Sequence, residues 1–172
     1  MSRRLFFTLL LIATMHVAAA AAAASRTAAD TLAYSGTFSS PARFYALRLR
    51  PGQDLRVELQ KLAREKHLRA AFVASCAGSC TRTSVRYANQ PSASVRDGHF
   101  EIVSLTGTLA ADGMHLHASF SDSTGTTFGG HLMDGSLVYT TAEIVVGELE
   151  RAAYSREPDS TYGYRELVVR RR

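Results

Sequence analysis

The sequence predicts an α+β fold in a single domain, a mostly antiparallel β-sheet with one main helix at about residues 54–66. Only one segment beyond the N-terminal apolar run repeats its apolar residues at helical spacing. Most of the remaining segments alternate apolar and polar residues, or are apolar runs bounded by turn residues, as strands are. The chain has 172 residues and shows no internal repeat, which is consistent with one domain.

The first expected strand is at residues 42–50. Leu47 and Leu49 fall on one face of this segment, and basic side chains fall on the other. The Pro51-Gly52 pair then ends the strand.

The helix follows directly. Asp54 is a good N-cap, and cationic side chains lie in the last turn, where they suit the helix dipole. One face of the segment is apolar, and it consists of Leu55, Leu59, Leu62 and Ala63.

Further strands account for most of the remaining sequence. Residues 68–79 form a nearly continuous apolar run, typical of a buried central strand. The other expected strands are at residues 80–89, 98–113, 114–122, 126–135 (a short strand or a loop), 136–150 and 160–170.

The N-terminus has the pattern of a secretory signal peptide. Residues 1–24 combine a basic start, an apolar run and small residues before Ser25. We expect cleavage there, a linker over residues 25–41 and the folded domain over residues 42–172, in a periplasmic or secreted protein without a membrane segment. The alternative is an uncleaved membrane anchor, since the apolar run is about long enough to span a bilayer.

The charge does not favour nucleic acid as a partner. Loss of Arg3 and Arg4 with the signal peptide lowers the formal net charge from +5 to +3. The remaining basic residues are scattered, apart from a terminal run of a kind that is usually solvated.

The only two cysteines, Cys76 and Cys80, are close in sequence. An oxidising compartment would allow a disulfide between them if a turn at Gly78-Ser79 brought their Cα atoms within reach. The alternative is two small buried side chains in an extended strand, which would hold those atoms roughly 13 Å apart.

Three of the six histidines fall in the segment HLHASFSDSTGTTFGGH. His115 and His117 are two residues apart, so on a strand both imidazoles point to the same face, about 6.6 Å apart along it. A turn after them and the glycine pair before His131 would allow a third imidazole to approach. Three histidines with one open coordination position are the catalytic form of a zinc site, and other divalent metals also bind imidazole. The alternative is three histidines that face solvent.

Two acidic residues are candidates for catalysis beside such a metal. Glu143 lies among apolar residues in TTAEIVV, so it is either a partly buried acid or a group that orients a ligating histidine. Glu101 in HFEIV is the second candidate. For each, the alternative is a structural ion pair, for instance with Arg86, or a solvent-facing strand residue.

The order of these segments resembles the plant- and prokaryote-conserved (PPC) domain, in its prokaryotic stand-alone form, over roughly residues 43–170. The resemblance rests on the GS and RYAN segments, the FEIVSLTGTL strand, the H-x-H strand and the GGHL segment, which occur in this order. It implies a homotrimer with a curved antiparallel sheet and a helix on one side. The fold is also similar to that of acetolactate decarboxylase and of zinc-dependent ester hydrolases. Such relatives hold zinc through an H-x-H pair and a later histidine, positions that His115, His117 and His131 match.

The resulting hypothesis is an exported PPC-domain protein with a three-histidine site for zinc or another divalent metal. It would act as a hydrolase or lyase on a small polar molecule, although the sequence does not decide whether the protein is an enzyme. One alternative is a non-catalytic trimeric binding or scaffold module. The other is DNA binding as in the plant members, whose AT-hooks this sequence lacks because it contains no R-G-R-P core.

Overall fold

The computed structural model describes residues 38–161 and 163–172. The expected signal peptide at residues 1–24 lies outside the described residues, as does most of the linker expected at residues 25–41. Residues 40–172 form one compact unit. Among the described residues, no helix has both the length and the apolar character needed to cross a bilayer.

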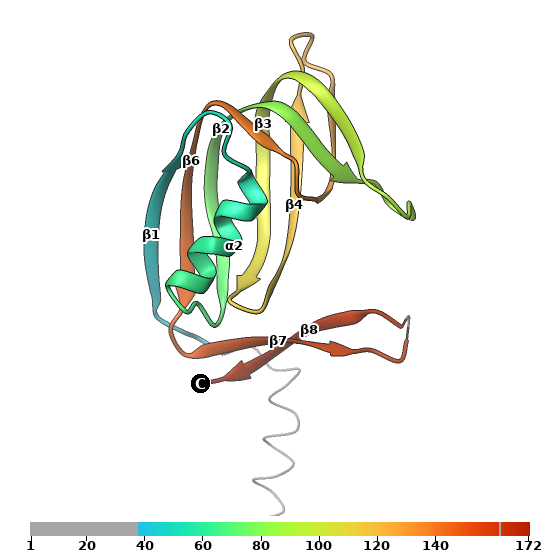
Figure 1. The fold of residues 1–172 in the computed structure, drawn as a ribbon. Coiled ribbons are helices and arrows are strands. Elements are labelled where there is room, and N and C mark those ends of the chain that lie inside the picture. The colour runs from blue at the N-terminus through green and yellow to red at the C-terminus, as the bar shows by residue number, and fades with distance from the viewer. Residues whose placement is uncertain (1–37, 162) are drawn as a thin grey trace, which may run out of the picture. The chain divides into compact units, whose positions relative to one another are not determined.

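The described part of the chain confirms the α+β prediction, with one helix and a predominantly antiparallel sheet (Figure 1). In chain order the elements are β1 (Ala42–Leu49), α2 (Leu55–Glu65), β2 (Ala71–Arg86), β3 (Ser94–Ala110), β4 (Gly113–Ser121), β5 (Thr127–Leu132), β6 (Leu137–Leu149), β7 (Ala152–Pro158) and β8 (Arg165–Arg171).

The main sheet is curved because its last strand returns to its centre. Six strands follow the order β1-β6-β2-β3-β4-β5, and β5 pairs a second time, with the end of β2. Val85 and Arg86 of β2 lie opposite Leu132 and His131 of β5. The strands β2, β3, β4 and β5 therefore close into a small ring, and this closure positions the candidate site.

Helix α2 packs across one face of the sheet (Figure 1). Asp54 caps it by accepting hydrogen bonds from the backbone N–H groups of Arg56 and Val57. The residues of the predicted apolar face that are fully buried are Leu55, Leu59 and Ala63. Each buried leucine contributes about 1.5–3 kcal/mol to folding. The helix bounds agree with the predicted 54–66, because Asp54 and Lys66 are its caps.

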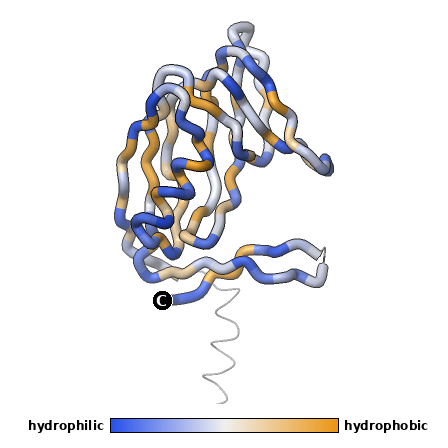
Figure 2. The backbone as a smooth tube through the Cα atoms, viewed as in Figure 1, coloured by the Kyte–Doolittle hydropathy of each residue, from blue (hydrophilic) through white to orange (hydrophobic). Residues whose placement is uncertain are grey.

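Two strand predictions were wrong. Residues 68–79 and 80–89 were expected to form separate strands, but most of this sequence is the single strand β2, which passes through Gly78-Ser79 with bulges instead of a turn. Strand β7 was missed altogether. It pairs with β8 to form a two-stranded hairpin, which is blue or pale in Figure 2 apart from an orange stretch where the strands cross.

The cysteines do not form a disulfide, since both are free. Both lie on β2, where Cys80 is buried and Cys76 is partly buried. Without the turn at Gly78-Ser79, the strand keeps the two thiols apart. Burial raises the pKa of Cys76 to about 11 and that of Cys80 to about 12, so both thiols are unreactive near neutral pH.

Candidate metal centre

The three candidate histidines lie on one face of the sheet, on the two neighbouring strands β4 and β5. His117 of β4 is directly opposite His131 of β5, and His131 is directly opposite Arg86 of β2. Directly opposed residues point to the same face of a sheet. His115 is two residues from His117 and therefore shares that face. The structure thus brings together the three residues predicted from the sequence, and all three side chains are accessible to solvent.

The imidazole rings of this histidine cluster (His115, His117 and His131) are in mutual contact. Their ring centroids are 4.8–5.7 Å apart. The Nε2 atoms of His115 and His117 are 3.2 Å apart, in a hydrogen bond whose donor depends on the tautomers. One nitrogen from each ring lies within 4.8 Å of the others.

The glycine pair allows β5 to fit between β4 and β2. A Cβ atom at Gly129 would lie 2.4 Å from the carbonyl oxygen of Ala118, and one at Gly130 would lie 2.6 Å from that of Arg86. Both distances are shorter than any real Cβ contact. Only glycine therefore permits this strand spacing, which places His131 beside His117, as the sequence suggested.

The cluster lies in a positively charged environment. The pKa of His131 is lowered to about 4, by burial first and then by the neighbouring His115 and Arg86. The pKa of His115 is also lowered, again by burial first and then by Arg156 and His117, while Glu166 acts in the opposite direction. At neutral pH these two imidazoles are uncharged, the form in which histidine binds metals.

The geometry of the cluster fits a divalent cation. In a tetrahedral zinc site with Zn–N bonds of about 2.0–2.1 Å, the ligand nitrogens lie about 3.3 Å apart. The pair formed by His115 and His117 already has this spacing at 3.2 Å. The other ligand atoms lie within 4.8 Å, so ring rotation would bring them to the same centre. All three ligands would be imidazoles, which suit zinc and also copper, iron and nickel.

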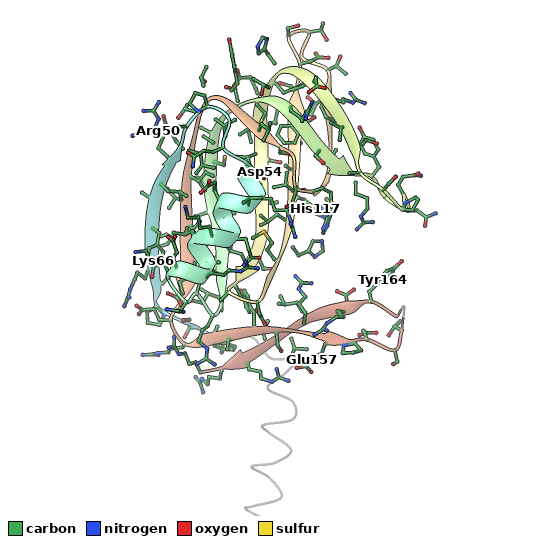
Figure 3. The ribbon with its side chains drawn as sticks, viewed as in Figure 1. Arg50, Asp54, Lys66, His117, Glu157 and Tyr164 are labelled. Atoms are coloured by element: carbon green, nitrogen blue, oxygen red, sulfur yellow. The ribbon has the colours of Figure 1, made fainter. Side chains whose placement is uncertain are left out.

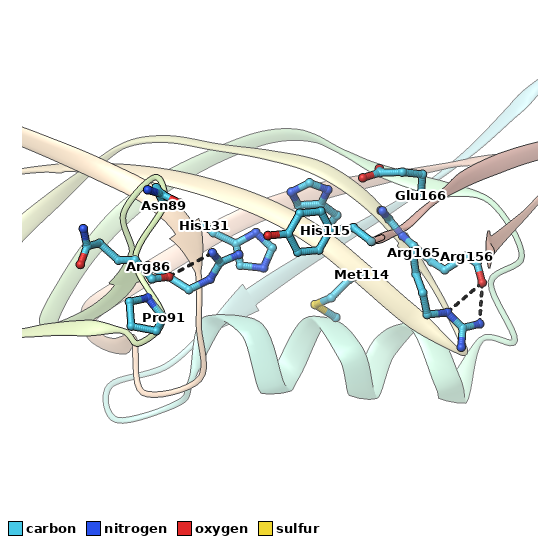
Figure 4. Close-up of a pocket in the computed structure, with 11 residues that line it drawn as sticks. Arg86, Asn89, Pro91, Met114, His115, His131, Arg156, Arg165 and Glu166 are labelled. Carbon is cyan, nitrogen blue, oxygen red and sulfur yellow. Dashed lines mark hydrogen bonds between the residues drawn. The ribbon is translucent and has the colours of Figure 1, made fainter. Parts of the chain in front are cut away.

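Two cavities open beside the cluster. The larger one, of about 740 Å³, is lined by His115 and His131 together with arginines from three segments and Glu166. The smaller one, of about 360 Å³, is lined by His115, His117, Arg156 and Glu166. Figure 3 shows His117 on the side of the sheet that faces the β7–β8 hairpin, and Figure 4 shows His131 and His115 beside Arg86 in the larger cavity.

The two acidic candidates lie elsewhere. Glu143 is on β6, opposite Arg48 and Ala77, and is exposed instead of partly buried. Glu101 is exposed on β3, opposite Ser79 and Ser121. Neither lines the two cavities beside the histidines, and neither forms an ion pair with another described residue.

The sequence did not reveal the charged residues that do line these cavities. Arg86 comes from β2, Arg156 from β7, and Arg165 and Glu166 from β8. Glu166 lies 35 residues beyond His131 in the sequence. It belongs to a hairpin whose first strand had no clear pattern, so no local signal connected it with the histidines.

Comparisons with known proteins agree with this architecture. The chain is 45% identical to a hypothetical protein of known structure from Salmonella cholerae-suis, with a TM-score of 0.78 over 80% of this chain and 99% of that one. It is 26% identical to a metal-containing protein from Archaeoglobus fulgidus, with a TM-score of 0.65 over 76% of this chain and 97% of that one.

Among curated proteins, the chain is 46% identical over 127 residues to the bifunctional protein GlmU of a Synechococcus strain, across 74% of this chain. The chain spans about a fifth of the length of the curated relatives it matches. The profile of the Plants and Prokaryotes Conserved (PCC) domain matches residues 36–150, and the chain therefore belongs to the Plants and Prokaryotes Conserved domain family.

Proposed function

We propose that the histidine cluster binds one divalent cation, zinc by preference, and that the protein is a metal-dependent hydrolase or lyase for a small polar molecule. The observation that carries the proposal is the convergence of three imidazole nitrogens within 4.8 Å on one face of a sheet, next to two cavities. The description of the Archaeoglobus neighbour as a metal-containing protein supports it.

Three protein ligands leave a coordination position for another molecule, as in catalytic zinc sites. A cation bound there would supply a Lewis acid that polarises a carbonyl or ester oxygen. The strands of the closed ring hold the ligands rigidly, because each histidine lies in a paired strand position. Rigid placement of this kind is what an open catalytic site requires.

Glu166 is the carboxylate that lines both cavities with His115. We propose that Glu166 is the general acid or base of the reaction, in place of Glu143 or Glu101. A carboxylate within reach of the reacting molecule serves as a general acid or base. Direct catalytic roles for Glu143 and Glu101 stay predictions. They would require a substrate to bind outside the two cavities beside the histidine cluster.

We also propose that the protein is exported, with removal of residues 1–24, and that it assembles as a homotrimer. Intact mass measurement of the native protein would test export, because the mature chain should begin at Ser25. Analytical ultracentrifugation of that protein would test the trimer. An intact Met1 in cytoplasmic protein would remove the argument for export and reopen DNA binding, which a duplex titration would then test.

Turnover of a panel of small esters and 2-oxo acids tests the catalytic part of the proposal. The wild type reconstituted with zinc should show activity that chelation removes and that His131→Ala and Glu166→Gln reduce. An Asp112→Asn variant is a matched control, since Asp112 is an exposed turn residue that lines neither cavity beside the cluster. Metal bound without any metal-dependent turnover would instead indicate a non-catalytic binding or scaffold module.

A further inference from the structure

Three arginines line the larger cavity without a carboxylate partner. The ion pairs among the described residues join Arg43 to Glu150, Arg56 to Asp134, Arg82 to Asp97 and Arg170 to Glu157. Arg86, Arg156 and Arg165 make no ion pair within that part of the chain, although Glu166 lines the same cavity. Arg86 and Arg156 are also half-buried. A half-buried charge without a counter-charge is costly, because part of its hydration is lost.

Neutral acceptors orient these guanidinium groups. Arg86 donates from Nη1 to the carbonyl oxygen of Gln90 at 3.4 Å, and Arg156 donates from Nη2 to Oγ1 of Thr108 at 3.3 Å. Arg165 donates from Nε and Nη2 to the carbonyl oxygen of Arg156, at 3.1 and 2.5 Å (Figure 4). A guanidinium carries five N–H donors. Arg86 and Arg156 therefore keep most of their donors available for a molecule in the cavity.

The two half-buried arginines flank the histidine cluster. Arg86 is directly opposite His131 across β2 and β5. Arg156 is hydrogen-bonded to Thr108, which is directly opposite His115 across β3 and β4. A cation held by the histidines would thus have a guanidinium on each side. A bound dication would increase the positive charge of this cavity further, and Glu166 alone could not balance it.

We propose that Arg86 and Arg156 form an anion-binding subsite beside the histidine cluster. The ligand class that follows is a small anion whose carboxylate or phosphate group binds the guanidiniums while its remaining polar atoms reach the metal position. Planar guanidinium groups suit both kinds of oxyanion, because they donate two parallel hydrogen bonds. The position of the anion next to a metal rests on the function proposed above, whereas anion binding itself can be measured without a metal.

Isothermal titration calorimetry with two anions and one neutral analogue tests the inference. Malonate, inorganic phosphate and uncharged malonamide would each be titrated into metal-free and zinc-loaded protein in chloride-free buffer. At least one of the two anions should bind and malonamide should not. Arg86→Gln and Arg156→Gln should each weaken anion binding by at least about tenfold, the effect of losing one charge-assisted hydrogen bond. The tighter of malonate and phosphate identifies the oxyanion that the subsite prefers.

Arg82→Gln is the matched control, because Arg82 is an exposed arginine on the same strand that pairs with Asp97 instead of lining the cavity. It should bind the anion as tightly as the wild type. Arg86→Lys keeps the charge without the planar pair of donors, so its affinity should lie between those of the wild type and Arg86→Gln. Circular dichroism and thermal melting would establish that each variant is folded.

The possible outcomes separate the two proposals. Arginine-dependent anion binding by a protein that binds no zinc would support the subsite and contradict the proposed metal-dependent function. Zinc binding without measurable affinity for either anion would overturn the subsite and leave the metal site standing. Anion affinity that is equal in the wild type, Arg86→Gln and Arg156→Gln would also overturn it.

Discussion

Replacing Gly130 with alanine should disturb the histidine cluster without altering any ligand. The added Cβ would lie 2.6 Å from the carbonyl oxygen of Arg86, about 0.8 Å short of the 3.4 Å at which ordinary contact begins. Strand β5 would have to move away from β2, where two residue pairs and the Met133-to-Ser84 hydrogen bond hold it. Overpacking of this kind costs about 1–3 kcal/mol. Because Gly130 precedes His131 directly, the imidazole should move with the strand.

Thermal melting and zinc titration against a competing chelator would measure both effects. The melting temperature of the metal-free variant should fall by roughly 3–12 °C, since one kcal/mol corresponds to about 3–4 °C in a domain of this size. Zinc affinity should fall by at least about tenfold, as it does when groups supporting metal ligands are lost. Gly113→Ala is the control, because a Cβ there meets nothing within 4 Å. If both alanine variants behaved alike, glycine would not be what positions His131.

Three further predictions concern the pH response, the thiols and the helix cap. Because the folded pKa of His131 is about 4, below the usual 6.5, the unfolded chain binds the proton first as pH falls. The free energy of unfolding of the metal-free protein should therefore fall between about pH 6.5 and 4, and it should fall less in His131→Asn. Urea denaturation at several pH values would measure both, and identical pH profiles for the wild type and the variant would contradict the prediction. Cys76 and Cys80 should resist iodoacetamide at pH 8 in the folded protein, because less than roughly one part in a hundred of each thiol is thiolate, and should react once the protein is unfolded. Mass spectrometry would follow the labelling, and rapid labelling of the folded protein would refute the prediction. Asp54→Ala should cost about 1–2 kcal/mol in chemical denaturation through loss of the N-cap, while Asp54→Asn should cost less.

Local sequence patterns predicted the elements whose apolar residues repeat at a regular spacing or whose ends carry clear capping or turn residues. The helix was predictable because Leu55, Leu59 and Ala63 repeat at helical spacing after the Asp54 cap. Strand β2 was divided in error because Gly78-Ser79 is common in turns, whereas here Gly78 is needed inside a strand: a Cβ there would lie 2.2 Å from the carbonyl oxygen of Thr141. Strand β7 was missed because its sequence AAYSREP has neither apolar alternation nor a continuous apolar run.

The histidines of the site were predictable because they are close in sequence and because strand geometry fixes their direction. The prediction of His131 as the third ligand depended on the Gly129-Gly130 pair, because residues without side chains allow a close approach of the strands. The surrounding charges were not predictable, since Arg86, Arg156 and Glu166 come from three strands separated by up to 80 residues. Tertiary packing of the β7–β8 hairpin brings them together, and no local pattern encodes that packing.

The metal content of purified, untagged protein tests the central claim most directly. After reconstitution with zinc and exhaustive dialysis, elemental analysis of the wild type should give about one zinc ion per chain, as a three-histidine site requires. His117→Ala should lose that metal, and His99→Ala should keep it, because His99 packs against the ring of Tyr139 and is not part of the cluster. A wild type without stoichiometric metal, or a His117→Ala variant that retains it, would contradict the account.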